Sequence, residues 1–137
     1  MTVSGGPVAI TCADFNRDGK LDLATANAGS GTVSVLFGDG AGGFSAPTSY
    51  DAGPGASALA CLDVNRDGAL DLVVVNPSND AVSLLLNDRI GGFGAPTAVP
   101  VGNHPVAVTV GDFNGDGIPD AAVSSAGARN ITILFGN

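Results

Sequence analysis

Three nearly identical acidic stretches recur along the chain: DFNRDGKLDL from Asp14 to Leu23, DVNRDGALDL from Asp63 to Leu72, and DFNGDGIPDA from Asp112 to Ala121. Each copy begins 49 residues after the one before it, and no insertion or deletion is needed to keep the copies in register. Internal repetition with a period of about 20–50 residues is typical of repeat architectures. The repeat therefore decides the fold class.

The register also holds outside these stretches. The sequence GFSAPT from Gly43 to Thr48 matches GFGAPT from Gly92 to Thr97. The apolar run VSVLF that ends at Phe37 recurs as VSLLL and again as ITILF. The chain is therefore interpreted as one module, residues 1–137, with repeats at about 5–53, 54–102 and 103–137, of which the third lacks its outer strand.

Each repeat is predicted to form four short strands. In the second repeat these lie at 57–62, 70–75, 81–86 and around 93–101, because runs rich in Val and Leu are separated there by Gly, Asn, Asp and Pro. Apolar residues on both faces of the middle strands indicate a sheet that is covered on both sides. Repeated four-stranded sheets predict an all-β fold of β-propeller blades, whereas the alternative, a β-solenoid, uses shorter repeats.

Composition narrows the range of functions. The chain has 13 acidic and 5 basic residues, a formal net charge of −8, and no Glu. No basic stripe is present to bind nucleic acid, and no apolar run is long enough to cross a membrane. The apolar content of 45% argues against disorder, and the lack of Glu argues against a mainly helical fold.

The repeated D-x-N-x-D-G-x-x-D loop predicts a calcium site. It resembles the start of an EF-hand loop, in which positions 1, 3, 5, 7 and 9 provide ligands and a Gly at position 6 permits a sharp turn. The candidate ligands are the side chains of Asp14, Asn16, Asp18 and Asp22 with the carbonyl of Lys20; Asp63, Asn65, Asp67 and Asp71 with the carbonyl of Ala69; and Asp112, Asn114, Asp116 and Asp120 with the carbonyl of Ile118. Position 12 holds Thr25, Val74 or Val123 in place of Glu. The Asp at position 9 is therefore expected to provide the bidentate carboxylate.

Asp and Asn also form turns without any metal. However, nine of the 13 acidic residues lie in these three loops. Carboxylates placed within a few ångströms repel one another unless a cation lies between them. Hard oxygen ligands in a flexible loop favour Ca²⁺ over Mg²⁺, so three Ca²⁺ sites per chain are expected.

Together with the acidic loop, Phe37-Gly38 followed by Gly43-Phe44-Ser45-Ala46-Pro47 resembles the FG-GAP or VCBS-type repeat. The resemblance covers essentially the whole chain. It implies an integrin-α-like β-propeller, often seven-bladed, with Ca²⁺ in the loops between the first and second strands of a blade. It also implies an extracellular or cell-surface location, although no signal peptide is recognised in this chain.

The function expected from these features is a calcium-binding propeller module for recognition, adhesion or scaffolding, without catalysis. No Glu is available to pair with an Asp, and His104 is the only histidine. A carbohydrate-binding lectin is an alternative, weakened by the absence of Trp and the single Tyr. A truncated or engineered fragment that self-assembles is another alternative.

Three blades are too few to close a ring, since propellers usually have about four to eight. Two open flanks are therefore expected, one lined by Val8, Ile10 and Val33 and the other by Val106, Val108 and Ile133. Their complementarity predicts a homodimer with six blades, and a protein or a glycan is the alternative partner.

The two cysteines, Cys12 and Cys61, occupy equivalent positions in the first two repeats, and Val110 takes that place in the third. A position that accepts Val is expected to be buried, so both cysteines are predicted to be buried free thiols.

Overall fold

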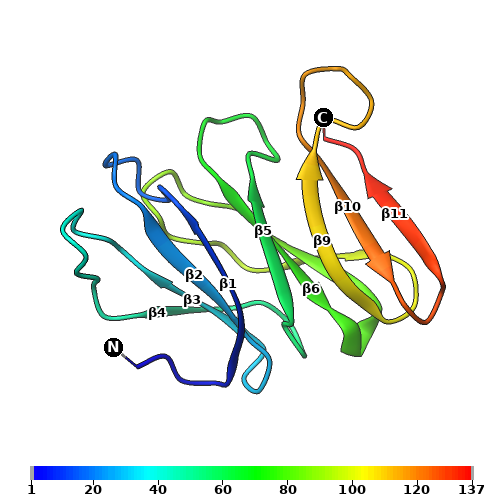
Figure 1. The fold of residues 1–137 in the computed structure, drawn as a ribbon, viewed down its shortest axis with the longest axis horizontal. Helices are drawn as coiled ribbons and strands as arrows, with labels where there is room; N and C mark the ends of the chain where they lie inside the picture. Colours follow the sequence, from blue (N-terminus) through cyan, green and yellow to red (C-terminus); the bar gives the residue numbers. More distant parts are fainter. Residues whose placement is uncertain (1, 137) are drawn as a thin grey trace.

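The computed structural model describes residues 2–136 and consists of three antiparallel sheets, shown in Figure 1. Strand follows strand in each sheet, so every sheet is a simple meander. Blade 1 contains β1 (Pro7–Ala13), β2 (Asp22–Asn27), β3 (Thr32–Leu36) and β4 (Thr48–Asp51); blade 2 contains β5 (Ala58–Leu62), β6 (Asp71–Asn76), β7 (Ala81–Leu85) and β8 (Thr97–Pro100); blade 3 contains β9 (Pro105–Gly111), β10 (Asp120–Ser125) and β11 (Asn130–Leu134). One short 3-10 turn, η1 (Pro77–Asn79), joins β6 to β7. The predicted all-β fold of propeller-like blades is confirmed, and the sheets do not close a ring within the described residues.

The predicted strands of the second repeat agree with β5, β6 and β7 to within one residue at each end. The fourth strand is shorter than expected, because β8 covers only Thr97–Pro100. Phe93 instead forms an isolated bridge with Asn87, and Gly94-Ala95-Pro96 then leads into β8. The third sheet has three strands, as expected for a repeat that lacks its outer strand.

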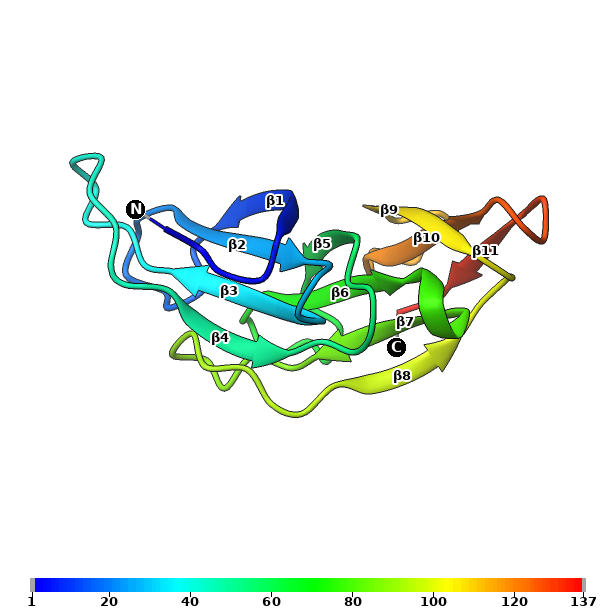
Figure 2. The same cartoon turned by 90° about the horizontal axis from the view of Figure 1, so that it is seen from below.

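The first core lies between blades 1 and 2. On β2 and β3, Ala24, Ala26, Val33 and Val35 alternate with residues of the opposite face and are fully buried. They pack against residues of blade 2 that include Leu72. Side chains alternate across a strand, so each sheet presents one face to each neighbour. Figure 2 shows the sheets side by side, with β5 between β2 and β6.

The second core lies between blades 2 and 3. Val73 and Val75 of β6 and Val82 of β7 point away from blade 1 and pack near Val123 of β10. Two expectations about the open flanks are therefore wrong. Val33 faces blade 2 instead of solvent, and Val108 packs against the second core. Ile10 and Val106 are exposed as expected. Val106 and Val108 differ although they are two residues apart, because the register of β9 against β10 shifts between Pro105 and Ala107.

The N-terminal segment, residues 2–6, runs past the turn between β2 and β3 before it enters β1, and Figure 2 draws it in front of these strands. The N–H of Ala28 donates to the carbonyl of Gly6 (3.1 Å), and the N–H of Gly29 donates to the carbonyl of Gly5 (2.9 Å). Gly5 approaches the Asn27 side chain so closely that a Cβ on Gly5 would lie 3.2 Å from the Asn27 Cβ. The segment therefore covers part of a sheet face that has no other blade against it.

The expectation of two buried thiols is wrong for Cys12. Both cysteines are free, but Cys12 is exposed and Cys61 is half-buried. Cys61 packs against the first core between two blades, whereas Cys12 occupies the equivalent place on the outer face of blade 1. Burial raises the pKa of the Cys61 thiol.

No helix within residues 2–136 is long and apolar enough to cross a membrane.

Candidate functional site

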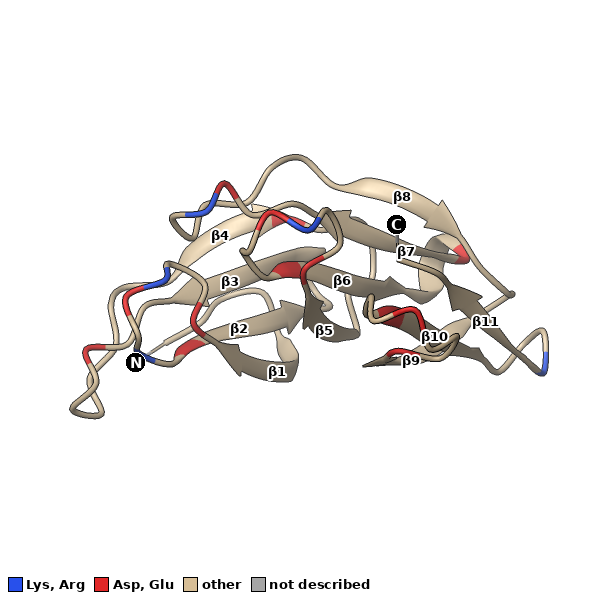
Figure 3. Ribbon diagram, turned by 90° about the horizontal axis from the view of Figure 1, so that it is seen from above, with Lys and Arg blue, Asp and Glu red and all other residues tan. Residues whose placement is uncertain are grey.

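The candidate site consists of three acidic loops: loop 1 (residues 14–22), loop 2 (63–71) and loop 3 (112–120). Each loop joins the first two strands of its blade. All three loops lie along the same edge of the molecule, the upper edge in Figure 1, and Figure 3 looks onto that edge with the acidic residues in red. The repeat therefore places three equivalent acidic loops side by side.

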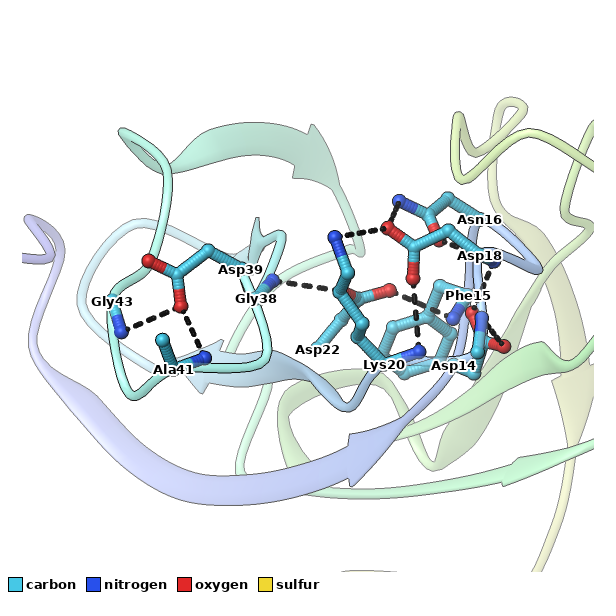
Figure 4. Close-up of polar contacts among 11 residues, drawn as sticks. Asp14, Phe15, Asn16, Asp18, Lys20, Asp22, Gly38, Asp39, Ala41 and Gly43 are labelled. Atoms are coloured by element: carbon cyan, nitrogen blue, oxygen red, sulfur yellow. Dashed lines mark hydrogen bonds and ion pairs between the residues drawn. The ribbon is translucent and has the colours of Figure 1, made fainter.

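Within loop 1, backbone N–H groups donate hydrogen bonds to the side-chain oxygens, as Figure 4 shows. The N–H of Asp18 donates both to Oδ1 of Asp14 and to Oδ1 of Asn16, at 3.1 Å each. The N–H of Gly19 donates to Oδ2 of Asp14 (2.8 Å), and the N–H of Lys20 donates to Oδ1 of Asp18 (2.9 Å). Positions 1, 3 and 5 of the loop thus surround one short stretch of backbone.

The same pattern recurs in the other two loops with nearly the same distances. In loop 2, the N–H of Asp67 is 3.1 Å from oxygens of both Asp63 and Asn65, and in loop 3 the corresponding distances from Asp116 are 3.2 and 3.0 Å. The N–H of Gly117 donates to Asp112. This bond is the main reason that the pKa of Asp112 is held below its usual value. The three loops are therefore three copies of one local structure.

Left-handed backbone at two positions produces this turn. Position 6 is Gly19, Gly68 or Gly117, with φ between 83° and 86°, as the sequence predicted. Position 4 is also left-handed, with φ 64° at Arg17 and 77° at Gly115. In the sequence, the only signal of left-handed backbone at position 4 is the glycine of the third copy, Gly115.

The Asp at position 9 has a structural role that the sequence did not reveal. Asp22 is fully buried, and its two carboxylate oxygens accept the N–H of Phe15 and the N–H of Gly38, each at 2.9 Å. Asp71 and Asp120 make the two equivalent pairs of bonds in their own blades. This carboxylate joins the loop to the end of the third strand of its blade.

Burial raises the pKa of Asp71, although the N–H groups of Asn87 and Val64 lower it. The carboxylates of Asp67 and Asp63 raise it further. Since each carboxylate oxygen has two lone pairs, the oxygens of position 9 can reach a cation only through the lone pairs that the N–H groups leave free.

The donors of each loop fit a hard cation, because all of them are oxygens. Side chains at positions 1, 3 and 5 converge, and the carbonyl at position 7 follows directly. Among residues 2–136, no group of three or more His, Cys, Asp or Glu side chains is close enough to hold an ion by itself. A cation in these loops would therefore need the Asn and backbone oxygens as well as the carboxylates. The only ion pair within the described part of the chain joins Lys20 to Asp18 at 3.8 Å.

Asn87, which was not among the residues predicted from the sequence, connects loop 1 of blade 1 to blade 2. It is buried, and its Nδ2 donates to the carbonyls of Phe15 in blade 1 (2.9 Å) and Leu70 (3.0 Å). Its equivalents in the other repeats are Gly38 and Gly136. The presence of Asn in one repeat, where the other two have Gly, is the only sign in the sequence that this position has a special role.

Replacing Asn87 with Ala is expected to lower the free energy of unfolding by about 1–3 kcal/mol, because the buried carbonyl of Phe15 and the half-buried carbonyl of Leu70 lose their donor. Urea unfolding measures the change. Asn79→Ala is the matched control, since Asn79 is exposed in η1, and it is expected to have little effect. Equal losses in the two variants would contradict the role of Asn87.

The Asp residues of the hairpins that follow β3 and β7 were also missed. Oδ1 of Asp39 accepts the N–H groups of Ala41 (2.7 Å) and Gly43 (2.9 Å), and these bonds lower the pKa of Asp39. Asp88 makes the equivalent bonds in blade 2. These bonds fix the turn that presents Phe44 and Phe93.

Comparison with known protein families gives one match. A family model described as an FG-GAP-like repeat matches residues 14–74 and residues 63–123. Each match begins at the first Asp of an acidic loop and extends through the next loop. No curated protein gives a significant match.

Proposed function

Because the chain belongs to the FG-GAP-like repeat family, we propose that it is a recognition or adhesion module whose propeller-like blades are stabilised by calcium in the three acidic loops. The observation that best supports this proposal is the repetition of the same oxygen-lined turn three times along one edge of the molecule. Family repeats of this type are typical of extracellular or cell-surface proteins, and we propose such a location.

In this proposal, Ca²⁺ in loop 1 is held by the side chains of Asp14, Asn16 and Asp18 and by the carbonyl of Lys20. Asp22 mainly orients the loop through the N–H groups of Phe15 and Gly38. The corresponding residues of loops 2 and 3 act in the same way. The ion supplies positive charge at the point where the carboxylates meet, which removes their mutual repulsion.

We further propose that the module is not an enzyme. Nine of its 13 carboxylates belong to the three equivalent loops, and His104 is its only histidine. The ligand is proposed to be a protein surface. The glycan alternative has no support from Tyr50, because this single tyrosine packs edge-on against Phe93, with ring centroids 5.4 Å apart.

Equilibrium dialysis against calcium tests the proposal. Three ions per chain are expected to bind, and Asp18→Ala, Asp67→Ala and Asp116→Ala are each expected to remove one. Asp39→Ala is the matched control, since Asp39 is an exposed Asp outside the loops, and it should leave three. Binding that survives in the triple loop variant would contradict the assignment of calcium to these loops.

A further inference from the structure

We propose that a second copy of this chain docks head to tail onto the first, with the outer face of its blade 1 against the open face of blade 3. In this contact Phe44 of the second copy meets Phe113 of the first copy in the same way that Phe93 meets Phe15 inside one chain. The proposal concerns assembly, and it does not depend on calcium binding.

The open face of blade 3 repeats a face that is buried twice inside the chain. Phe113 and Ile131 occupy the positions of Phe15 and Val33, which are fully buried between blades 1 and 2. In blade 3 these side chains are 50% and 68% exposed. Large apolar side chains on one sheet face favour burial against another surface.

The outer face of blade 1 carries the complementary residues. Phe44 is 37% exposed, whereas its equivalent Phe93 is buried in the first core. Exposed Ile10 and Leu21 correspond to Leu59 and Leu70, which are half-buried and pack against that core. Blade 1 therefore presents the residue types that blade 2 uses to contact its neighbour.

The contact between blades 1 and 2 provides the geometry for the proposed contact. Phe15 and Phe93 meet edge to face, with ring centroids 5.7 Å apart and an interplanar angle of 77°. Aromatic pairs of this kind stabilise a contact by about 0.5–1.5 kcal/mol beyond the burial of their area. The same relation between two chains would place Phe44 of the second copy against the ring of Phe113.

The N-terminal segment does not prevent this docking. By the repeat, Val3 corresponds to Ala52, which is buried between blades 1 and 2. There Nδ2 of Asn76 donates a hydrogen bond to the carbonyl of Ala52 (2.8 Å). Residues 2–6 thus take the same place on blade 1 that the linker before β5 takes on blade 2. Since blade 1 packs against blade 2 with that linker in place, residues 2–6 leave room for a neighbouring blade.

A second copy is the favoured occupant because both halves of the contact are present on one chain. Such head-to-tail contacts close into a ring when the rotation between chains divides the circle. Two copies of the described residues provide six blades, which lies within the usual range of about four to eight, whereas three copies would provide nine. The expected assembly is therefore a closed dimer.

Light scattering during size-exclusion chromatography tests the proposal, and wild-type protein at micromolar concentration is expected to have twice the chain mass of 13.3 kDa. Phe113→Asp and Phe44→Asp are each expected to give monomers. Ile90→Asp is the matched control, because Ile90 is 74% exposed on the blade 2 hairpin and belongs to neither open face. It should remain dimeric. Circular dichroism checks that the variants keep the β-sheet spectrum.

A mixing experiment tests the head-to-tail direction. Phe113→Asp protein retains an intact blade 1 face, and Phe44→Asp protein retains an intact blade 3 face. An equimolar mixture is therefore expected to form a heterodimer through one intact contact, although neither variant dimerises alone. A monomeric wild type would overturn the proposal. A Phe44→Asp variant that stays dimeric would also overturn it, because two blade 3 faces would then be in contact.

Discussion

Chelating calcium with EDTA is expected to lower the midpoint of thermal unfolding by on the order of 20 °C relative to protein in millimolar calcium. An ion that binds only the folded chain stabilises it by about 2.7 kcal/mol per site when its concentration is a hundred times Kd. Three occupied sites would contribute about 8 kcal/mol. The physical reason is that the carboxylates of each loop are held together by the fold, and without a cation they repel one another.

Differential scanning calorimetry measures this shift. Magnesium at the same concentration is the control for ionic strength, and it is expected to restore much less stability because it prefers a small octahedron and keeps its own water. Melting curves that coincide in EDTA and in calcium would contradict calcium as the ion that stabilises the loops.

Asp71→Ala is expected to lower the free energy of unfolding by about 3–5 kcal/mol even in EDTA. The ionised carboxylate is costly to bury, as its raised pKa shows, but its removal leaves the N–H groups of Val64 and Asn87 without an acceptor. Each buried N–H that loses its partner costs about 1–3 kcal/mol. Guanidinium unfolding in EDTA measures the loss.

Two further variants separate the structural role of Asp71 from metal binding. Asp71→Asn keeps one acceptor oxygen and is expected to lose less stability than Asp71→Ala. Asp67→Ala is expected to lose little stability in EDTA, since Asp67 bonds only within its own loop, and to lose much more in calcium. If Asp67→Ala and Asp71→Ala behaved alike in EDTA, position 9 would have no role separate from the metal.

The sequence was sufficient to predict the repeat, three of the four strands in blade 2, and the position of each acidic loop between the first two strands of its blade. These features are local, because strand length, turn residues and left-handed glycines depend on neighbours in the chain. The side chains that face the two open flanks were predicted less well. Val33 was assigned to the wrong face of β3, where an error of one residue exchanges the two faces. Val108 was misplaced because a register irregularity in β9 separates it from Val106.

The features that sequence reasoning missed depend on contacts between segments distant in the chain. Asn87 reaches Phe15 across 72 residues, and Asp22 reaches Gly38 on the far side of a hairpin. In the sequence, the Asp at position 9 resembles the other acidic residues of the loop. Only the folded arrangement shows that its oxygens are turned to the backbone.

The two faces of β6 belong to two different cores, and all six of its residues are buried. Pairing within a blade joins strands that are neighbours in the chain, so hydrogen bonding favours rapid local folding. Stability, in contrast, depends on nearest-neighbour coupling between blades, as in a one-dimensional array. Duplicating or deleting a repeat then adds or removes one interface of a kind already present. The number of repeats can therefore change during evolution without the invention of a new core.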